Sequence, residues 1–311
     1  MAVITDTTPL DGMGHRQDPV AVYEKHRQEL ARSKMGQTIL MIALFLGLLI
    51  FSVVTSQFFP ERLAQAGGRL FEYFGTIMPN LEWDKLFLGR DEQGRAIEGS
   101  LTFWYTDLDK YLALIWETIL MAITATLLGT AGALALCFAG SRNLMSNSWI
   151  YFFTRRFMEI CRGVPEILIA LIFVFAFGIG PLAGILAVAI HSAGALGKLF
   201  AEVNENVSQR PIDGIRGVGG NWFEQMRYGV LPQVLPNFVS YGFLRFEVNV
   251  RASSIIGFVG AGGIGQELNR VISFYSDDRV LAVLILVVLT VTVIDLISER
   301  LRLYFIGKEQ L

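Results

Sequence analysis

Charged side chains lie inside several long apolar runs of this sequence, and they are the first residues that could do chemistry. A charge within an apolar run is costly to bury, so it is a candidate for function by default. The run over 234–259 holds two arginines, and an arginine offers fixed N–H donors that suit an oxyanion. The residues that we expect to border a pathway for such an anion are Arg245, Glu247, Asn249, Arg251, Ser253 and Glu166.

The two arginines of this run differ in their neighbours. Arg251 follows Glu247 by four residues, and this spacing predicts an ion pair on one helical face. Arg245 has no carboxylate three or four positions away, and it projects roughly 120° from Arg251 around a helix. We therefore expect Arg245 to border water and assist an anion, whereas Arg251 holds the bundle together. A purely structural pair is the alternative for Glu247 and Arg251.

Other chemical patterns point away from an enzyme. Gly260, Gly262 and Gly265 spell the dinucleotide fingerprint, but a long apolar run precedes them, whereas the fingerprint needs a strand before it. We expect a turn with close backbone packing instead. Because no H-E-x-x-H or similar ligand spacing occurs, we expect neither metal nor cofactor on this chain, and a membrane enzyme is the less favoured class. No G-x-x-x-x-G-K-[ST] motif occurs either, so any ATP would be hydrolysed by another chain.

The elements that position these residues follow from composition. Of the 311 residues, 53% are hydrophobic and 17% are charged, whereas soluble proteins carry about 25% charged residues. The apolar residues gather in runs that are long enough to cross a bilayer, which predicts an all-α integral membrane protein. Six transmembrane helices are expected, over 37–59, 111–139, 150–178, 182–201, 234–259 and 280–298.

Single residues refine this picture. The first run exceeds the apolar part of a cleaved signal peptide, which is the alternative, so we expect a retained helix. Gly129 and Gly132 predict close contact between helices, and Pro165 predicts a kink in the third run. Cys137 and Cys161 lie in apolar runs and are expected to be buried thiols.

Positive charge predicts the orientation. Loops expected inside carry twice as many Lys and Arg residues as loops expected outside, which places both termini in the cytoplasm. The expected organisation is a cytoplasmic tail at 1–36, the first transmembrane helix at 37–59, a periplasmic segment at 60–109, a membrane core at 110–306 and a tail at 307–311. The net charge of −2 gives no basic footprint for nucleic acid.

The polar segment between the fourth and fifth runs predicts two short helices outside the bilayer. Pro211 suits the first turn of a helix, and Asp213 in that turn would face the positive end of the dipole. The glycines that follow Gly217 would end this helix. Asn221 can cap the second helix, with Glu224 completing a capping box.

The second short helix carries apolar side chains. Trp222 and Met226 are four residues apart and share one face. Leu231-Pro232 should end the helix, because the residue before a proline avoids the helical region. Apolar side chains exposed in this way indicate a protein contact. The alternative is a loop packed against its own bundle.

This loop resembles the EAA loop of ABC importer permeases. The family pattern is Glu-Ala-Ala, three residues, Gly, nine residues, Ile, one residue and Leu-Pro. The residues at the matching positions are Asp213, Gly214, Ile215, Gly219, Leu231 and Pro232. Gly229 departs from the pattern, because it stands where isoleucine is expected. The flanking stretches Arg162–Val203 and Phe246–Gly265 resemble the phosphonate-type permeases, and the resemblance covers about residues 105–300.

The resemblance implies the type I (MetI-like) architecture of ABC importer permeases, with six transmembrane helices and short cytoplasmic coupling helices in the loop 203–233. It also implies the bacterial inner membrane, a second permease copy, two ATPase subunits that bind Mg-ATP, and a periplasmic or lipid-anchored substrate-binding protein. The residues implied in coupling to the ATPase are Asp213, Gly214, Gly219, Trp222, Met226, Leu231 and Pro232.

The cargo that the resemblance implies is a phosphonate or a similar phosphorus oxyanion. Phosphite, phosphate and a small amino acid remain alternatives within the same permease class. A secondary transporter would leave the loop between the fourth and fifth runs without a partner.

Overall fold

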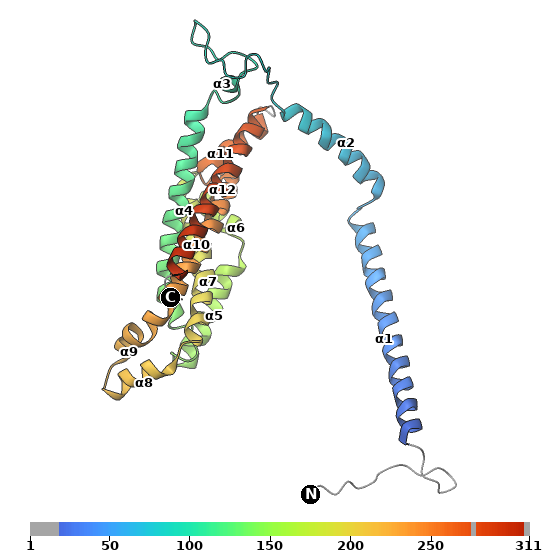
Figure 1. The fold of residues 1–311 in the computed structure, drawn as a ribbon, viewed down its shortest axis with the longest axis vertical. Coiled ribbons are helices and arrows are strands. Elements are labelled where there is room, and N and C mark those ends of the chain that lie inside the picture. The colour runs from blue at the N-terminus through green and yellow to red at the C-terminus, as the bar shows by residue number, and fades with distance from the viewer. Residues whose placement is uncertain (1–18, 275–277, 308–311) are drawn as a thin grey trace. The chain divides into compact units, whose positions relative to one another are not determined.

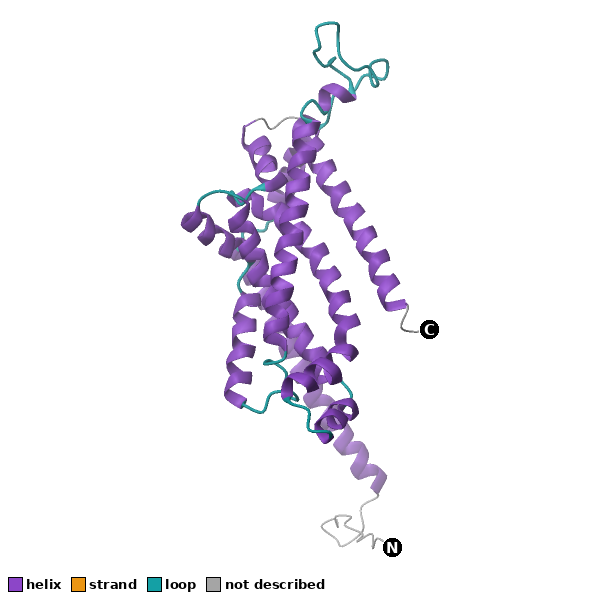
Figure 2. Cartoon of the chain, turned by 90° about the vertical axis from the view of Figure 1, so that its left-hand side faces the viewer, coloured by secondary structure: helices purple, strands orange, loops and turns teal. Residues whose placement is uncertain are grey.

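The computed structural model describes residues 19–274 and 278–307, and these residues are mostly helical (Figure 1; Figure 2). Within this described part, β-structure is confined to an isolated bridge between Arg90 and Ala96. The expected all-α class is therefore confirmed. The chain divides into two compact units, Met1–Tyr73 and Phe74–Leu311, and the second unit contains the helical bundle.

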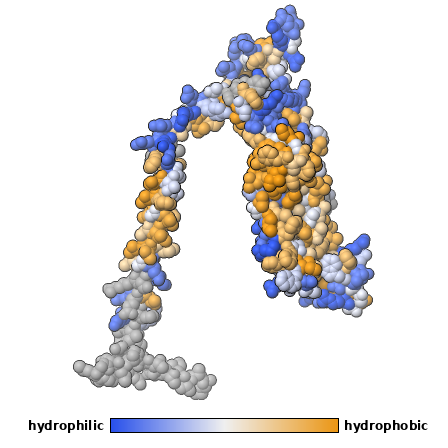
Figure 3. All heavy atoms as spheres, turned by 180° about the vertical axis from the view of Figure 1, so that it is seen from behind, coloured by the Kyte–Doolittle hydropathy of each residue, from blue (hydrophilic) through white to orange (hydrophobic). Residues whose placement is uncertain are grey.

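Four helices of the described residues are long and apolar enough to cross a membrane. They are α1 (Pro19–Thr55, apolar over Lys34–Thr55), α4 (Leu108–Cys137), α7 (Pro181–Glu205) and α12 (Asp278–Gly307). Apolar side chains cover the middle of the bundle, and polar side chains gather at its two ends (Figure 3). Four of the six expected runs thus form helices of spanning length and composition.

The third expected run is not one helix. It forms α5 (Ser148–Gly163) and α6 (Glu166–Phe177), which are bent by 85° and would count as a fifth span if taken together. Pro165 lies at the break, as expected, but the break is far sharper than a kink. The cause is Val164, whose extended backbone (φ −84°, ψ 124°) is the conformation that a following proline favours.

The fifth expected run forms α10 (Leu231–Ile256). At 1.5 Å per residue its 26 residues extend roughly 39 Å, so length does not prevent it from spanning. Its charges do lower its hydropathy, and it is not among the helices that pass by length and composition. The described chain thus gives four or five spans by these criteria rather than the expected six.

Small residues bring α4 and α7 together. A Cβ atom on Gly129 would lie 2.6 Å from Ser192 Cβ, and one on Gly132 would lie 3.0 Å from Ala193 Cβ. These distances are closer than side-chain carbons normally approach, so the glycines permit the contact, as expected. Cys137 and Cys161 are buried free thiols, which confirms the interpretation of both cysteines.

Three helices on the segments expected outside were not predicted from the sequence. Residues 60–109, expected to be a polar segment, begin with α2 (Pro60–Ile77) and end with the short α3 (Leu101–Trp104). Residues 260–279 contain α11 (Gly263–Phe274). Buried Glu267 of α11 lies 2.8 Å from Lys110 Nζ at the start of α4, and this ion pair fastens α11 to the bundle.

The glycine pattern at 260–265 forms a packed turn, as expected, and not a nucleotide site. Gly260, Gly262 and Gly263 have φ values of 87°, 86° and 68°, a left-handed conformation that glycine adopts readily. The turn is buried, with Ala261 fully inaccessible. A Cβ atom on Gly265 would overlap the carbonyl oxygen of Ser254. The turn follows α10 and the short 3-10 helix η2 (Gly257–Val259), so the strand that the fingerprint needs is not present at this place.

Candidate functional site

Four polar side chains form a directional chain of hydrogen bonds across α4, α7 and α10. Arg245 Nε donates to Ser192 Oγ at 3.0 Å, and Ser192 Oγ donates to Asn249 Oδ1 at 3.0 Å. Asn249 Nδ2 donates to Thr126 Oγ1 at 2.8 Å, and Thr126 Oγ1 donates to the Ala122 carbonyl at 2.6 Å. Each hydroxyl both accepts and donates, so the polar groups are satisfied inside the bundle. The first donor of this hydrogen-bonded chain is the guanidinium group of Arg245.

Arg245 and Asn249 of this chain were predicted as site residues from the sequence, whereas Ser192 and Thr126 were not. Ser192 and Asn249 are fully buried, and Thr126 is nearly so. Hydroxyl groups in apolar runs are common, because they can bond to their own helix. The signal that could have found these two residues is that a buried asparagine needs partners from neighbouring helices.

Arg245 lies half-buried near a carboxylate on α6. Glu166 is the first residue of α6, directly after the break, and its charge acts on Arg245. His191 lies beside it, with Nδ1 3.4 Å from Glu166 Oε2 and 3.1 Å from the Val164 carbonyl oxygen. The break between α5 and α6 thus places the Glu166 carboxylate near the polar chain, with His191 of α7 beside it.

The prediction that Glu247 and Arg251 pair with each other is wrong. Arg251 Nη2 lies 3.8 Å from Asp295 Oδ1, and Glu247 Oε1 lies 3.9 Å from Arg302 Nη1. Arg251 reaches Glu247 through the backbone, because its Nε donates to the Glu247 carbonyl oxygen at 3.4 Å. Both charges therefore connect α10 to α12 instead of closing on their own helix. Ser253, the last expected pathway residue, is buried.

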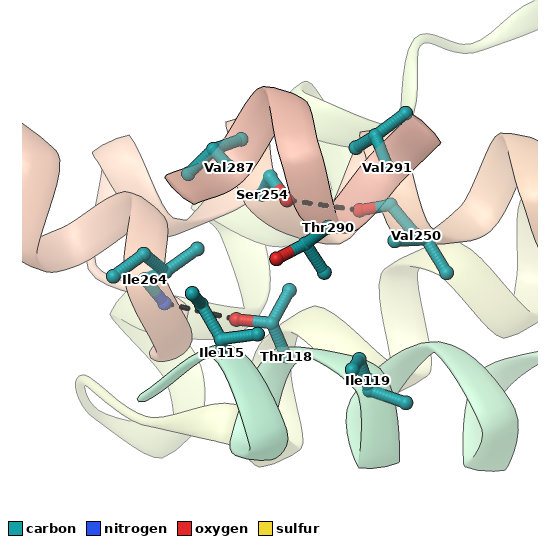
Figure 4. A pocket seen from close by; sticks show the side chains of 9 residues that line it. All are labelled: Ile115, Thr118, Ile119, Val250, Ser254, Ile264, Val287, Thr290 and Val291. Atoms are coloured by element: carbon teal, nitrogen blue, oxygen red, sulfur yellow. Dashed lines mark hydrogen bonds between the residues drawn. The ribbon is translucent and has the colours of Figure 1, made fainter. Parts of the chain in front are cut away.

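A small cavity lies between α4, α10, α11 and α12 in the bundle (Figure 4). Its volume is about 10 Å³, enough for about one water molecule. Thr118, Ser254 and Thr290 line it, and each hydroxyl donates to a carbonyl of its own helix. Thr118 Oγ1 also accepts a hydrogen bond from the Ile264 amide at 2.9 Å (Figure 4). Because its volume is only about 10 Å³, this cavity is too small to pass an oxyanion. In the described residues, no group of three His, Cys, Asp or Glu side chains is placed to hold a metal ion.

The loop between α7 and α10 begins with α8 (Gln209–Gly217). Pro211 lies in its first turn, as expected, and Ile212 is buried. Asp213 does not lie in that turn, because α8 begins four residues before it. Its expected contact with the helix dipole is thus wrong, and it pairs with Arg216 at 3.3 Å on the exposed face.

Glycines end α8, as expected. The Gly219 amide donates to the Arg216 carbonyl at 3.0 Å, and the Gly220 amide donates to the Ile215 carbonyl at 2.9 Å. These two bonds and the φ of 88° at Gly219 form a Schellman motif. Gly219 is the position that matches the glycine of the family pattern, so its backbone conformation gives that match a physical reason.

The second short helix is capped by Asn221, as expected. Asn221 Oδ1 accepts from the Glu224 amide at 3.0 Å, and the Glu224 carboxylate accepts from the Asn221 amide at 2.7 Å. The helix starts as α9 (Trp222–Glu224) and continues as a π-helix, η1 (Gln225–Val230). The capping box is therefore confirmed, but the helix does not remain regular.

Trp222 and Met226 of this segment line one apolar hollow with the end of α4. Trp222 Nε1 donates to the Leu144 carbonyl at 3.2 Å, and its ring packs edge-on against Phe138. Met226 is buried in a core cluster of the bundle. The loop is therefore fastened to the bundle on this side.

Leu231-Pro232 does not end the second helix. The Leu231 amide donates to the Met226 carbonyl, the five-residue spacing of a π-helix, and α10 begins at Leu231 with Pro232 in its first turn. Proline is tolerated there because the first amides of a helix lack partners anyway. The departure at Gly229 also has a reason. A Cβ atom on Gly229 would lie 3.2 Å from Ile212 Cα, so a larger side chain would push α8 away.

Apolar side chains remain exposed at the tip of this loop. Val218, Phe223 and Tyr228 are 87%, 76% and 60% exposed, although they lie among charged and polar residues. Exposed apolar residues of this size indicate a contact with another protein. The loop thus combines a side fastened to the bundle with a tip open to a partner.

Known proteins resemble this chain in sequence and fold. The putative phosphite transport system permease protein HtxC of Stutzerimonas stutzeri is 39% identical over 197 residues, which cover 63% of this chain and 70% of HtxC. The putative cryptic phosphonate transport system permease protein PhnE2 of Escherichia coli is 45% identical over 121 residues, 39% of this chain and 99% of PhnE2. An inward-facing structure of the MetNI methionine ABC transporter matches with a TM-score of 0.55 and 22% identity, over 63% of this chain and 95% of that chain, which shows the fold alone.

The family of binding-protein-dependent transport system inner membrane components matches residues 131–304. This range includes the loop with α8, α9 and η1 and all of the hydrogen-bonded chain except Thr126. The resemblance found in the sequence is therefore confirmed. The chain belongs to the family of binding-protein-dependent transport system inner membrane components, and it is a transmembrane permease subunit of an ABC importer rather than an enzyme.

Proposed function

We propose that this permease passes a phosphorus oxyanion across the bacterial inner membrane, with phosphonate, phosphite and phosphate as the candidate cargoes. Two relatives carry the names of phosphite and phosphonate transport systems. The observation that carries the proposal is Arg245, a guanidinium group inside the bundle whose hydrogen bond goes to the neutral hydroxyl of Ser192. Its remaining N–H donors suit a tetrahedral oxyanion.

The surroundings of Arg245 support modest attraction instead of tight binding. An anion must leave the pathway again, so a single guanidinium group is better suited than a cluster of cations. Glu166 acts on the same arginine through its charge and competes with a bound anion. Ser192 accepts a hydrogen bond from the guanidinium group, and Asn249 accepts one from Ser192 in turn. This ordering reduces the cost of fixing the Arg245 side chain on binding.

The pathway lies between this chain and a second permease copy in this proposal. The cavity beside Thr118 and Ser254 is about 10 Å³, so the oxyanion does not pass at this point of the bundle. Glu247, Asn249, Arg251 and Ser253 then support the wall that carries Arg245, because three of them contact neighbouring helices. Six spans follow if α10 and the bent pair of α5 and α6 each cross the membrane.

The loop 203–233 couples this pathway to ATP hydrolysis on two partner subunits that bind Mg-ATP. Asp213, Gly214 and Gly219 lie on its exposed side, where α8 serves as the coupling helix. Trp222, Met226, Leu231 and Pro232 connect α8 to the base of α10, so a push on α8 reaches the helix that carries Arg245. Both termini and this loop are cytoplasmic, and a periplasmic or lipid-anchored binding protein delivers the cargo from outside.

Transport by the reconstituted complex tests the proposal. The permease is placed in liposomes with its ATPase and its binding protein, and ATP-driven uptake of radiolabelled phosphate is measured with phosphite, methylphosphonate or methionine as competitor. We expect the complex to take up phosphate. A phosphorus oxyanion that binds the delivery protein should block this uptake, and methionine should have no effect. Competition by methionine, or binding of none of the three oxyanions by the complex, would contradict the proposed cargo.

A further inference from the structure

Helix α2 (Pro60–Ile77) separates apolar from charged residues along its length. At about 100° per residue, Leu70, Phe74 and Ile77 fall on one side of the helix. The residues that lie more than about 100° away from this side are Glu61, Gln65, Arg69, Glu72 and Thr76. A pattern of this kind is typical of a helix that lies at a boundary between apolar and aqueous surroundings.

Two of the three residues on the apolar side of α2 are exposed. Leu70 is 55% exposed and Phe74 is 48% exposed, whereas Ile77 is 3% exposed. Ile77 packs with Val271 of α11 and Val280 of α12. Within the second unit, the bundle therefore buries Ile77 and leaves Phe74 exposed.

Helix α2 is too charged to count as a candidate span. It carries Glu61, Arg62, Arg69 and Glu72 within 18 residues, and it is not among the candidate spans. Its two acids and two arginines balance, so the helix has no net charge that would draw it to anionic lipid. An exposed apolar side on a neutral helix needs a cover that works through apolar contact.

Both ends of α2 are tied to ends of candidate spans. The apolar stretch of α1 ends at Thr55, and the intervening residues 56–59 can extend at most roughly 15 Å. At the other end, Ile77 packs against Val280, which lies in the first turn of the candidate span α12. The ends of spans lie at the membrane surface, so both ends of α2 lie near it.

We propose that α2 is a membrane-surface helix, and that its bare apolar side is buried among lipid acyl chains just below the headgroups. Helices with this division of residues lie in the plane of the interface with their apolar side some 5–10 Å deep. The occupant of the bare side is thus the lipid bilayer itself. Hydrophobic burial holds the helix there, independently of anionic lipid.

Spin-label accessibility of the full permease in lipid nanodiscs tests this proposal. Single cysteines are introduced as Leu70→Cys and Phe74→Cys on the apolar side and as matched Gln65→Cys and Glu72→Cys controls on the polar side. The background carries Cys137→Ala and Cys161→Ala. Collision with oxygen, which dissolves in lipid, is compared with collision with a water-soluble nickel chelate.

We expect the ratio of oxygen to nickel accessibility to be several-fold higher at positions 70 and 74 than at 65 and 72. The ratio should be unchanged between zwitterionic and anionic lipid and between low and high salt. Shielding of positions 70 and 74 from both reagents would show a protein cover, such as a second permease copy, and would overturn the proposal. Nickel accessibility at all four positions would overturn it as well, as would lipid immersion that requires anionic lipid.

Discussion

Asn249 is the residue that joins both halves of the hydrogen-bonded chain. It accepts from Ser192 and donates to Thr126. A buried polar group that loses its partner costs about 1–3 kcal/mol, so Asn249→Leu should destabilise the permease by an amount in this range. Thermal unfolding of the purified permease in detergent measures the effect. Asn237→Leu, at an exposed position of the same helix, serves as the control, and an equal loss in both variants would contradict the role of Asn249.

The polar groups of the site can be predicted from the sequence, but not all of their partners can. Arg245, Asn249 and Glu166 stand out because a polar residue in an apolar run is rare. The pairing of Arg251 with Asp295 could not be predicted from spacing, because Asp295 lies on another helix. Local spacing suggested Glu247 as the partner, and the packing of α10 on α12 determined a different one.

Gly219 ends α8 and thereby sets the shape of the loop at the scale of the element. A valine in its left-handed conformation is strained by roughly 1–2 kcal/mol, although no neighbouring atom would clash. Gly219→Val should therefore lower cargo uptake per ATP hydrolysed while membrane insertion stays unchanged. Uptake and ATPase assays on the reconstituted complex check this expectation.

The matched control for Gly219→Val is Gly217→Ala. Gly217 is the last residue of α8 and also has open space around it, but it keeps a negative φ. Alanine at this position should retain coupled uptake. Wild-type uptake by Gly219→Val, or equal loss in both variants, would contradict a role for the turn.

The elements of the loop show where local sequence determines structure. The capping box at Asn221 and the glycine turn at Gly219 depend on neighbouring residues alone, and both were predicted. Leu231-Pro232 was expected to end a helix, but the π-helix before it lets the chain continue into α10. Gly229 of this π-helix packs against Ile212, a contact across the loop that the sequence does not reveal.

The apolar runs predicted the long helices well and the amphipathic ones poorly. The expected runs at 111–139, 182–201 and 280–298 lie within or nearly within α4, α7 and α12. Helices α2 and α11 were missed because their apolar residues are spaced around one face and form no continuous run. Pro165 predicted the position of the break between α5 and α6. It did not predict the bend angle of 85°, since the angle depends on what packs beside the break.

The orientation proposed for the whole molecule rests on the distribution of its positive charges and can be tested by labelling. Single cysteines at Arg90→Cys and Phe274→Cys should react with a membrane-impermeant maleimide in intact cells. Val218→Cys, at a position that is 87% exposed, should react only after the membrane is permeabilised. The native cysteines are buried and are replaced in this background. Labelling of position 218 in intact cells would contradict the proposed topology.

ATP-driven uptake by Arg245→Gln, beside Arg251→Gln, tests most directly whether Arg245 contacts the cargo. Arg245 donates to the neutral Ser192, whereas Arg251 pairs with Asp295 on α12, so the two variants remove different kinds of contact. We predict that Arg245→Gln leaves the complex assembled and its ATPase active but lowers oxyanion uptake at least tenfold, the effect of losing about 1.4 kcal/mol. Arg251→Gln should lower the unfolding temperature and retain uptake in the assembled complex. Normal uptake by Arg245→Gln, with uptake abolished in a folded Arg251→Gln complex, would contradict the account.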